Sequence, residues 1–468
     1  MMNNELRPYE LRPVTDIPWI ESIPAHWDVQ RGKAVYKKLN RPTRSNDEVV
    51  TCFRDGVVTL RKNRRTTGFT ESIKEIGYQG IRKGDLVIHV MDAFAGAIGV
   101  SDSDGKGTPV YSVCESKVDL NNYYYAYVIR EMAKTGFIQS LYRGIRERSS
   151  DFRFEVFANQ YLPIPPLSEQ DQIVKYLDHQ LAKINKFIKT KKKLIAVLKE
   201  RKQAIINEVV TKGIDPNVKM RPSGIEWLGD VPEHWKIIKL KYLTKESFQY
   251  GANESGYQYQ DNAYRYIRIT DISQNGDLKT EGALFLPEAI GANYRLRDGD
   301  ILFARSGATV GKSFLFKDEY GPSSYAGYLI KFAPDRSKVL PECVYFYTMS
   351  SAYSLWLNQV FIQSTIQNVS AEKYKNLVIP LPSLDEQAKL LIYIKEKAEV
   401  FDKSIVRILS EIELIQEYKN SLISDVVTGK VDVRNIVIEK LEDEIIEDRE
   451  LDEDSIDEDV LEAEDGDE

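Results

Sequence analysis

The 468-residue sequence predicts two mixed α/β (α+β) modules in tandem, each followed by one long helix, with the two helices paired. Three observations predict this fold class. The sequence contains an internal repeat, each copy begins with short strand-like runs, and each copy ends in a long segment with a heptad pattern. A chain of this length also exceeds one typical hydrophobic core, so two to four domains are expected.

The repeat is visible in three motifs. WIESIPAHW at 19–27 returns as WLGDVPEHW at 227–235, displaced by 208 residues. RKGDLVI returns as RDGDILF, displaced by 215, and LPIPPLSEQ returns as LVIPLPSLDEQ. After the shared Glu-Gln the displacement settles at 217. A repeat of about 210 residues is too long for a solenoid, so it indicates a duplicated two-part unit.

The first part of each copy, about 140 residues long, is broken by Gly, Pro and Asn into short apolar-alternating runs. Examples are DLVIHV, AYRYIRIT and NLVIP. These runs predict a module rich in strands. The second part is a single helix, whose start in the second copy carries a capping box at Ser383–Glu386. The first copy has a weaker version at Ser168–Asp171.

Apolar residues recur along both helices at alternating spacings of four and three. In the first copy eight of ten such positions are apolar, and in the second copy nine of ten. A 3.5-residue period held for five heptads predicts a coiled-coil seam, and helices of ~43 residues would be ~60 Å long. Two amphipathic helices that each pack on their own module are the alternative. The predicted seam consists of Leu177, Leu181, Ile184, Ile188, Ile195, Leu198, Ile205, Ile394, Phe401, Ile405, Ile408, Ile412, Ile415 and Leu422.

Charge is distributed unevenly along the chain. The net charge is −7, but the last 30 residues carry 18 Asp/Glu and 2 Lys/Arg, which leaves 62 Lys/Arg and 53 Asp/Glu elsewhere. The body is therefore basic and the tail acidic. Such a tail is typical of disorder. It either solvates the protein or folds back onto a basic groove and competes with nucleic acid.

Cysteine usage and hydropathy predict a cytoplasmic protein. Cys52, Cys114 and Cys343 lie far apart, without the spacing of a disulfide framework or a zinc site. The N-terminus lacks the apolar core of a signal peptide. No apolar run reaches the ~20 residues of a membrane span.

The stretch RSGATVGKS at 305–313 resembles a phosphate-binding loop, which would make the protein an ATPase. Gly307 and Gly311 enclose three residues, whereas that loop requires four. The following SFLFKDEYGP alternates like a strand, whereas a phosphate-binding loop opens a helix. We therefore expect a turn between two strands. The first copy lacks an equivalent of Lys312 and has four extra residues before its loop glycine.

Cations cluster among aromatic residues in both modules, in LRKNRR, YRGIRER and YRYIR. Arginine suits phosphate and guanine edges, and several cations in each module would give salt-dependent DNA affinity. A solvated basic face is the alternative. The DNA-binding candidates are Arg61, Lys62, Arg64, Arg65, His89, Asp92, Arg143, Arg146, Arg148, Tyr264, Arg265, Arg268, Arg305, Ser306, Thr309 and Lys312.

The sequence contains no recognisable catalytic or metal-binding motif. It lacks a paired acidic nuclease cluster, a nucleophile elbow, a Gly-rich cofactor loop and the Asn-Pro-Pro-aromatic motif of amino-methyltransferases. His26 and His234 belong to the repeated PxHW, which we expect to anchor each module by packing. We therefore predict no enzyme activity, no metal and no cofactor for this chain.

Taken together, the doubled WxxxxPxHW, Gly-Asp strand and IPxP…LxEQ resemble the specificity (S) subunit of type I restriction–modification systems. The resemblance covers the chain to about Asn435. It implies two target recognition domains that each read half of a split, asymmetric DNA site. It also implies an antiparallel coiled-coil spacer with pseudo-twofold symmetry, which docks two methyltransferase (M) subunits. Restriction/translocase (R) subunits are further expected partners, with S-adenosylmethionine and ATP on the partner subunits.

The resemblance assigns 1–163 and 213–380 to the recognition domains, 164–212 and 381–435 to the spacer helices, and 436–468 to an acidic tail. The tail departs from the family pattern. The sequence leaves two alternatives open. The chain could be a coiled-coil scaffold whose modules bind protein, or it could serve a related system that fuses methylation and cleavage in one partner.

Overall fold

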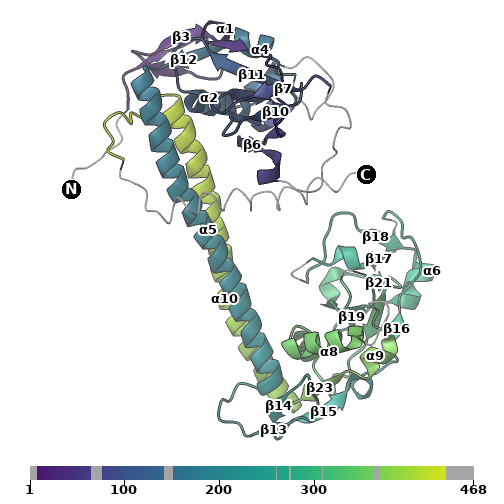
Figure 1. Cartoon of the computed structure of the whole chain (residues 1–468). Coiled ribbons are helices and arrows are strands. Elements are labelled where there is room, and N and C mark those ends of the chain that lie inside the picture. Colours follow the sequence, from purple (N-terminus) through teal and green to yellow (C-terminus); the bar gives the residue numbers. More distant parts are fainter. Residues whose placement is uncertain are drawn as a thin grey trace. The chain divides into compact units, whose positions relative to one another are not determined.

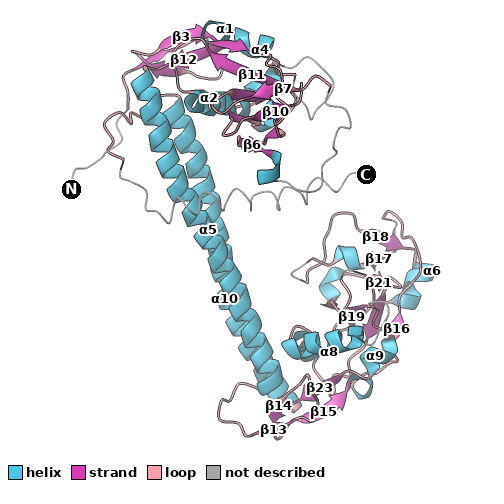
Figure 2. Cartoon of the chain, in the orientation of Figure 1, coloured by secondary structure: helices cyan, strands magenta, loops and turns pink. Residues whose placement is uncertain are grey.

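The computed structural model describes residues 8–64, 76–141, 151–259, 261–273, 276–307, 309–362 and 368–438. The chain divides into two compact units. Unit 1 comprises Met1–Lys192 and Ser410–Glu468, and unit 2 comprises Lys193–Leu409. Each unit contains one module of mixed strands and helices together with part of both long helices (Figure 1). Figure 2 shows strands and helices interleaved in both modules, which confirms the predicted mixed α/β content.

The module of unit 1 is built on a four-stranded antiparallel sheet. Its order is β4 (Tyr36–Lys38), β11 (Tyr111–Ser116), β8 (Leu86–His89) and β9 (Ile98–Val100). Helix α2 (Asn122–Lys134) packs against β8 and β9. The remaining elements of this module are β1 (Leu11–Pro13), β2 (Ser22–Pro24), β3 (Asp28–Arg31), α1 (Gly32–Val35), β5 (Val50–Cys52), β6 (Val58–Leu60), η1 (Arg61–Asn63), β7 (Gln79–Ile81), η2 (Ala93–Ala95), β10 (Gly105–Gly107), α3 (Phe137–Ser140), α4 (Phe154–Asn159) and β12 (Tyr161–Ile164).

The module of unit 2 repeats this arrangement. Its sheet has the order β16 (Gln249–Tyr250), β22 (Leu329–Phe332), β19 (Ile301–Ala304) and β20 (Ser313–Leu315). The remaining elements are β13 (Met220–Pro222), β14 (Asp230–Pro232), β15 (Lys236–Lys239), η3 (Leu240–Tyr242), β17 (Tyr264–Ile267), η4 (Ile269–Asp271), β18 (Leu284–Leu286), α6 (Glu288–Gly291), η5 (Ala292–Tyr294), η6 (Asp318–Tyr320), β21 (Ser323–Tyr325), α7 (Pro341–Tyr347), α8 (Ser351–Ile362), α9 (Ala371–Lys375) and β23 (Val378–Leu381).

The strand after each Gly-Asp motif is buried on both faces, which explains its continuous apolar run. In β8, Leu86 and Ile88 join the core that contains α2, whereas Val87 joins a separate cluster on the other face. In β19, Ile301 and Phe303 face the larger core, and Leu302 faces the other cluster. The two-residue period of the strand therefore serves two cores in each module.

Each module is closed by strands that are distant in sequence. Strand β3 pairs with β12 in unit 1, and β15 pairs with β23 in unit 2, both antiparallel. The later strand of each pair lies directly before a long helix. Because that strand is part of the repeated IPxP motif, this motif ends the module and fixes where the helix begins.

The long helices are α5 (Leu167–Lys212) and α10 (Leu384–Val427), with 46 and 44 residues. All fourteen predicted seam residues are buried or half-buried. Other apolar residues of these helices, such as Val197 and Val406, are exposed and lie off the seam. Gly213 and Gly429 follow the two helix ends with φ of 84° and 75°, the left-handed conformation common at helix C-termini.

Polar contacts join the two helices in unit 1. The Lys191 ammonium lies 2.7 Å from the Glu411 carboxylate, and Lys419 Nζ donates to Asn185 Oδ1 at 2.8 Å. The residue number rises along α5 as it falls along α10. The two helices therefore run antiparallel in this unit.

In unit 2, Lys202 Nζ donates to the Asp402 carboxylate at 2.7 Å. Lys202, together with the lysines at 191 and 419, is a polar exception in the apolar heptad series. Each exception forms a polar contact with the opposite helix. Polar groups in an otherwise apolar seam are able to specify one register over others.

The expected boundaries at residues 164 and 381 coincide with the ends of β12 and β23. The compact units differ from the predicted division, because each of them takes part of both helices instead of separating helices from modules. Within the described ranges, no helix combines the length and the apolar character needed to span a membrane.

Candidate nucleic-acid interface

The repeated His-Trp motif bonds to the repeated glutamate at the start of each long helix. In unit 1, His26 Nε2 lies 2.9 Å from Glu169 Oε2, and Trp27 Nε1 donates to Glu169 Oε1 at 2.9 Å. In unit 2, His234 and Trp235 make the same two contacts with Glu386, both at 2.9 Å. Trp27 and Trp235 are also buried, so the motif anchors each module by packing, as predicted, and by these hydrogen bonds, which the sequence did not indicate.

The neighbouring glutamine ties the same helix start to the module. Gln170 Nε2 donates to the Pro165 carbonyl at 2.8 Å, and its Oε1 accepts from the backbone N–H of Asn121 at 2.9 Å. Asn121 is the N-cap of α2. Gln387 repeats both bonds, with the Pro382 carbonyl and the N–H of Leu340, the N-cap of α7. The shared Glu-Gln therefore fixes each module against its helix.

The anchor of unit 1 has an additional layer. The Tyr9 hydroxyl also donates to Glu169. Burial, followed by this hydrogen bond, raises the pKa of Tyr9 well above its usual range. The Arg434 guanidinium lies 4.9 Å from the Tyr9 ring centroid and pairs with Asp432 at 2.7 Å. The side chain of Glu169 is 3% exposed and that of Glu386 27%.

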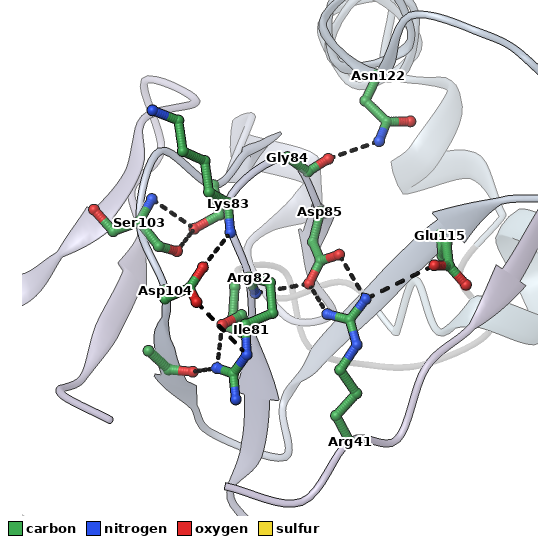
Figure 3. A network of polar contacts seen from close by, with 12 residues as sticks. Arg41, Ile81, Arg82, Lys83, Gly84, Asp85, Ser103, Asp104, Glu115 and Asn122 are labelled. Atoms are coloured by element: carbon green, nitrogen blue, oxygen red, sulfur yellow. Dashed lines mark hydrogen bonds and ion pairs between the residues drawn. The ribbon is translucent and has the colours of Figure 1, made fainter. Parts of the chain in front are cut away.

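The repeated Gly-Asp motif forms a turn at the entry of the central strand. Asp85 accepts from the backbone N–H of Arg82 at 2.8 Å and receives two bonds from the Arg41 guanidinium (Figure 3). Asn122 of α2 donates to the Gly84 carbonyl at 2.7 Å and so fixes the same turn to the helix (Figure 3).

The equivalent turn in unit 2 keeps the backbone bond and changes the charges. Asp300 accepts from the N–H of Arg297 at 2.9 Å. No arginine forks onto Asp300 within the described residues. Burial raises the pKa of Asp300 to about 6. Glu246, which pairs with both Lys331 and Arg297, lies in the same charge cluster.

The stretch RSGATVGKS connects two antiparallel strands, as predicted. Residues 304–312 join β19 to β20, whose register pairs Phe303 with Ser313. A strand rather than a helix therefore follows the loop, unlike in a phosphate-binding loop.

The equivalent loop of unit 1, residues 89–97, is equally long, because Ile88 pairs with Ile98. The expected four-residue insertion was therefore wrong. The glycine that corresponds to Gly96 is Gly311 rather than Gly307, and both have positive φ, 94° and 88°. Ala97 stands at the position of Lys312.

The loop of unit 2 brings a cation together with exposed tyrosines. The Arg305 guanidinium lies 4.9 Å from the Tyr250 ring centroid, and the Arg305 N–H donates to the Tyr328 carbonyl at 3.0 Å. Tyr250 is 42% and Tyr328 66% exposed. Ser306 pairs with Asn368 in an isolated β-bridge. Together they form an aromatic and basic surface that suits contact with a nucleic-acid backbone and bases.

The other candidates of unit 2 are spread over two elements. Lys312 is exposed at the end of the loop and Thr309 is half-buried in its turn. Tyr264 and Arg265 lie on β17, where Arg265 donates to the Lys279 carbonyl. Arg268 is held by Asp271 at 2.7 Å, and this hydrogen bond raises its pKa. The structure therefore brings Arg305, Ser306, Thr309 and Lys312 together, whereas the β17 group is separate.

The described candidates of unit 1 are largely engaged within the module. Lys62 pairs with Glu48 at 2.5 Å, and Arg61 donates to the Thr51 hydroxyl at 3.3 Å. The Arg64 side chain is 1% exposed, pairs with Asp55 at 2.7 Å and lies over Phe53. Its burial makes Arg64 a structural residue of the module, which corrects its place among the candidates.

His89 is the last residue of β8, and Asp92 lies in the loop that follows. The Asp92 N–H donates to His89 Nδ1 at 3.0 Å, and burial lowers the pKa of His89. Asp92 also accepts from Arg54 at 3.2 Å. The remaining candidates, Arg65, Arg143, Arg146 and Arg148, lie outside the described residues.

Sequence reasoning missed the tyrosines beside Arg305. Tyr250 and Tyr328 are 78 residues apart in sequence, and both lie beside Arg305 because β16 pairs with β22. The aromatic content of the second module was the available signal, since Tyr257 and Tyr259 are also exposed. In the described ranges, no cluster of His, Cys, Asp and Glu could hold a metal ion.

A family model described as the type I restriction modification DNA specificity domain matches residues 87–197 and 232–424, in one stretch of each repeat. Together these stretches cover more than half of the chain.

The chain is also similar to proteins named as type I specificity subunits. The chain is 27% identical over 288 residues to the type I restriction enzyme MjaVIII specificity subunit of Methanocaldococcus jannaschii, covering 60% of this chain and 64% of that protein. It is 22% identical over 441 residues to the putative MjaX specificity subunit of the same organism, covering 89% and 96%. It thus spans less than two thirds of the first relative and nearly all of the second.

One solved structure shows the same fold, with a TM-score of 0.64 at 15% identity, covering 87% of this chain and 99% of that one. It is described as the structural basis underlying complex assembly and conformational transition of the type I R-M system. At this identity the similarity concerns the fold alone.

Proposed function

Because this chain belongs to the type I restriction modification DNA specificity family, we propose that it is the non-catalytic DNA-recognition subunit of a type I restriction–modification complex. The observation that carries the proposal is the duplicated scaffold. Two modules share one sheet order, one anchor and one Gly-Asp turn, yet present different side chains at equivalent loops. A shared scaffold with divergent loops suits two readers of different sequences.

We propose that each module reads one half of a bipartite DNA site. The hairpin loops are equal in length, but the first offers His89 and Asp92 where the second offers Ala304 and Gly307 beside Arg305. Because the modules are not identical, the site is asymmetric. Arg305 with its neighbouring tyrosines is the strongest candidate contact, since arginine forks onto guanine and tyrosine stacks on bases.

We propose that α5 and α10 form an antiparallel coiled coil that fixes the gap between the half-sites. Helices of 46 and 44 residues would each extend ~65–70 Å at 1.5 Å per residue. The contact of Lys202 with Asp402 and that of Lys419 with Asn185 support an internal pseudo-twofold repeat. The repeat displacement of 217 residues relates Lys202 to Lys419 and Asn185 to Asp402, so the two contacts are equivalent in the two copies.

The partners proposed for this chain are double-stranded DNA, two M subunits docked on the paired helices, and R subunits, without a membrane. S-adenosylmethionine and ATP would bind to the partner subunits in the cytoplasm. The basic balance of the body, 62 Lys/Arg against 53 Asp/Glu up to Ile438, is consistent with a DNA partner.

The spacer role is tested by length. Four residues inserted after Lys191 in α5 rotate the seam by more than one turn and lengthen one helix. We expect this insertion to alter the gap in the methylated motif or to abolish methylation, because recognition depends on fixed half-site spacing. A matched insertion in the tail after residue 450 should change nothing. An unaltered motif from the α5 variant would refute the spacer role.

A further inference from the structure

A hollow in unit 1 concentrates positive charge around one arginine. It lies among helix α2, the turn at Arg54, the turn before Gly96 and the last turns of α10. Arg54, Arg130 and Lys134 line it, with Glu131 as the acidic residue of its wall. Arg130 also lines a neighbouring hollow near Asp55, so its side chain stands between the two.

Arg130 is half-buried, and its guanidinium lacks a committed partner. Within the described part of the chain, Arg130 forms no hydrogen bond or ion pair. Asp55 attracts it electrostatically, but that carboxylate is paired with Arg64 at 2.7 Å. Burial lowers the pKa of Arg130. Where the effective dielectric constant is below that of water, a cation attracts an anion more strongly than a fully exposed cation does.

Other cations surround it. Lys134 is 45% exposed, donates to the Asn420 carbonyl at 3.1 Å, and lies 4.0 Å from Glu131. Lys419 lies nearby. Burial lowers the pKa of Lys419, and the positive charge of Arg130 lowers it further. Arg54, whose side chain is 51% exposed, forms an ion pair with Asp92 at 3.2 Å. The carboxylates within reach are already engaged, so the hollow carries an excess of positive charge.

The backbone around Arg130 leaves room for its side chain. A Cβ on Gly56 would lie 2.4 Å from Arg130 Nη1, and one on Gly96 would lie 3.8 Å from Arg130 Nε. Both glycines have positive φ. The equivalent of Arg130 in unit 2, counted from the helix N-caps Asn121 and Leu340, is Met349. The feature therefore belongs to the first module alone.

We propose that this hollow binds an oxyanion of the phosphate class, held by Arg130 with Arg54 and Lys134 at its rim. Arginine presents a planar fork that matches phosphate oxygens, and lysine adds a compact charge. The anion would supply the counter-charge that Arg130 lacks. The site goes beyond the proposed half-site reading, because it requires no base contact. A backbone phosphate of bound DNA and a free phosphate-bearing molecule are its two sources.

Titration calorimetry of the full chain with inorganic phosphate, at constant ionic strength, tests the site. We expect saturable binding that Arg130→Gln weakens at least tenfold and Lys134→Gln several-fold. Lys134 is exposed at the rim, so its variant keeps the test valid if Arg130→Gln fails to fold. Lys83→Gln, an exposed cation elsewhere in unit 1, is the matched control. Absence of saturable binding, or equal binding by all variants, would overturn the proposal.

The salt dependence of duplex DNA binding separates the two sources. If the anion is a DNA phosphate, Lys134→Gln should lower the slope of log affinity against log salt by about one. An unchanged slope combined with weakened phosphate binding identifies a free phosphate-bearing molecule. A chain that binds phosphate without binding DNA would contradict the proposed function while supporting this site.

Discussion

The two anchors perform the same task in different surroundings. Glu169 accepts from Tyr9, His26 and Trp27, and its side chain is 3% exposed. Among the described residues, the Glu386 carboxylate bonds to His234 and Trp235 alone, and this side chain is 27% exposed. A duplicated motif thus preserved its hydrogen bonds while its burial diverged. Burial, rather than the motif, should decide how much each anchor contributes to stability.

Two segments make the difference: Tyr9 bonds to Glu169 directly, and the residues after α10 pack behind Tyr9. After α10 ends, residues 428–438 pack on unit 1, where Val433 is fully buried and Gln172 donates to the carbonyls of Val433 and Ile436. In unit 2 the equivalent residues after α5 continue into β13. Residues 428–438 therefore cover the first anchor, and the described residues after α5 form no such cover at the second.

Replacing each anchor glutamate should give the largest contrast. We expect Glu169→Ala to lower the free energy of unfolding of unit 1 by ~3–5 kcal/mol, because it strands buried donors. Glu386→Ala should cost unit 2 ~1–2 kcal/mol, since water reaches its site. Hydrogen exchange under increasing denaturant reports on each unit separately. Equal losses would show that exposure does not control the anchors.

The two Gly-Asp turns should differ in their response to pH. The pKa of Asp300 in the folded state is about 6, against 3.8 for an unperturbed aspartate. Its ionised form is therefore disfavoured by folding. The penalty is absent below pH ~4, grows as pH rises, and is complete above pH ~6, where it reaches at most ~3 kcal/mol.

Asp300→Asn removes this titration. The variant should gain stability relative to the wild type between pH 4 and 7, measured by denaturant unfolding at several pH values. Asp85→Asn is the matched control, and it should be destabilising at neutral pH because Arg41 loses its closer ionic partner and keeps, among the described residues, only Glu115 at 3.9 Å. A pH-independent difference between wild type and Asp300→Asn would contradict the assignment.

Shortening the chain should separate the described segment from the acidic tail. Deleting residues 431–468 removes the buried Val433 and the Arg434 contact with Tyr9, which should cost unit 1 ~2 kcal/mol. Deleting 439–468 should leave the melting temperature unchanged. If both deletions behave alike, the segment does not close the first anchor.

The smallest contrast concerns the seam lysines. Lys419 is half-buried, its partner Asn185 is neutral, and burial lowers its pKa, so Lys419→Met should be neutral or stabilising by ~1 kcal/mol. Lys202→Met instead removes an ion pair with Asp402 and should cost at most ~1 kcal/mol. Chemical denaturation measures both. Stabilisation by the Lys202 variant would reverse the expected order.

The sequence predicted those parts of the fold that depend on periodicity and repetition. The heptad pattern identified both helices, and the repeated PxHW marked the anchors, because a repeated motif keeps its partners. The sequence could not predict that Glu169 contacts His26, since the two residues are 143 positions apart. Likewise, no local pattern distinguishes the buried Arg64 from an exposed cation.

The interface was the least predictable part. Basic clusters indicated a region, but which cations lie together depends on strand pairing, as the meeting of Tyr250 with Arg305 shows. The alignment of the two loops also depended on register. The pairing of Ile88 with Ile98 corrected it, because a glycine at a loop carries no information about its partner strand.

DNA recognition by this chain is tested by reading the methylation pattern of the source genome with and without the gene. We expect a split, asymmetric methylated motif that disappears when the gene is deleted and returns when it is restored. In a strain that carries an active methyltransferase partner, an unchanged pattern would contradict DNA recognition by this chain.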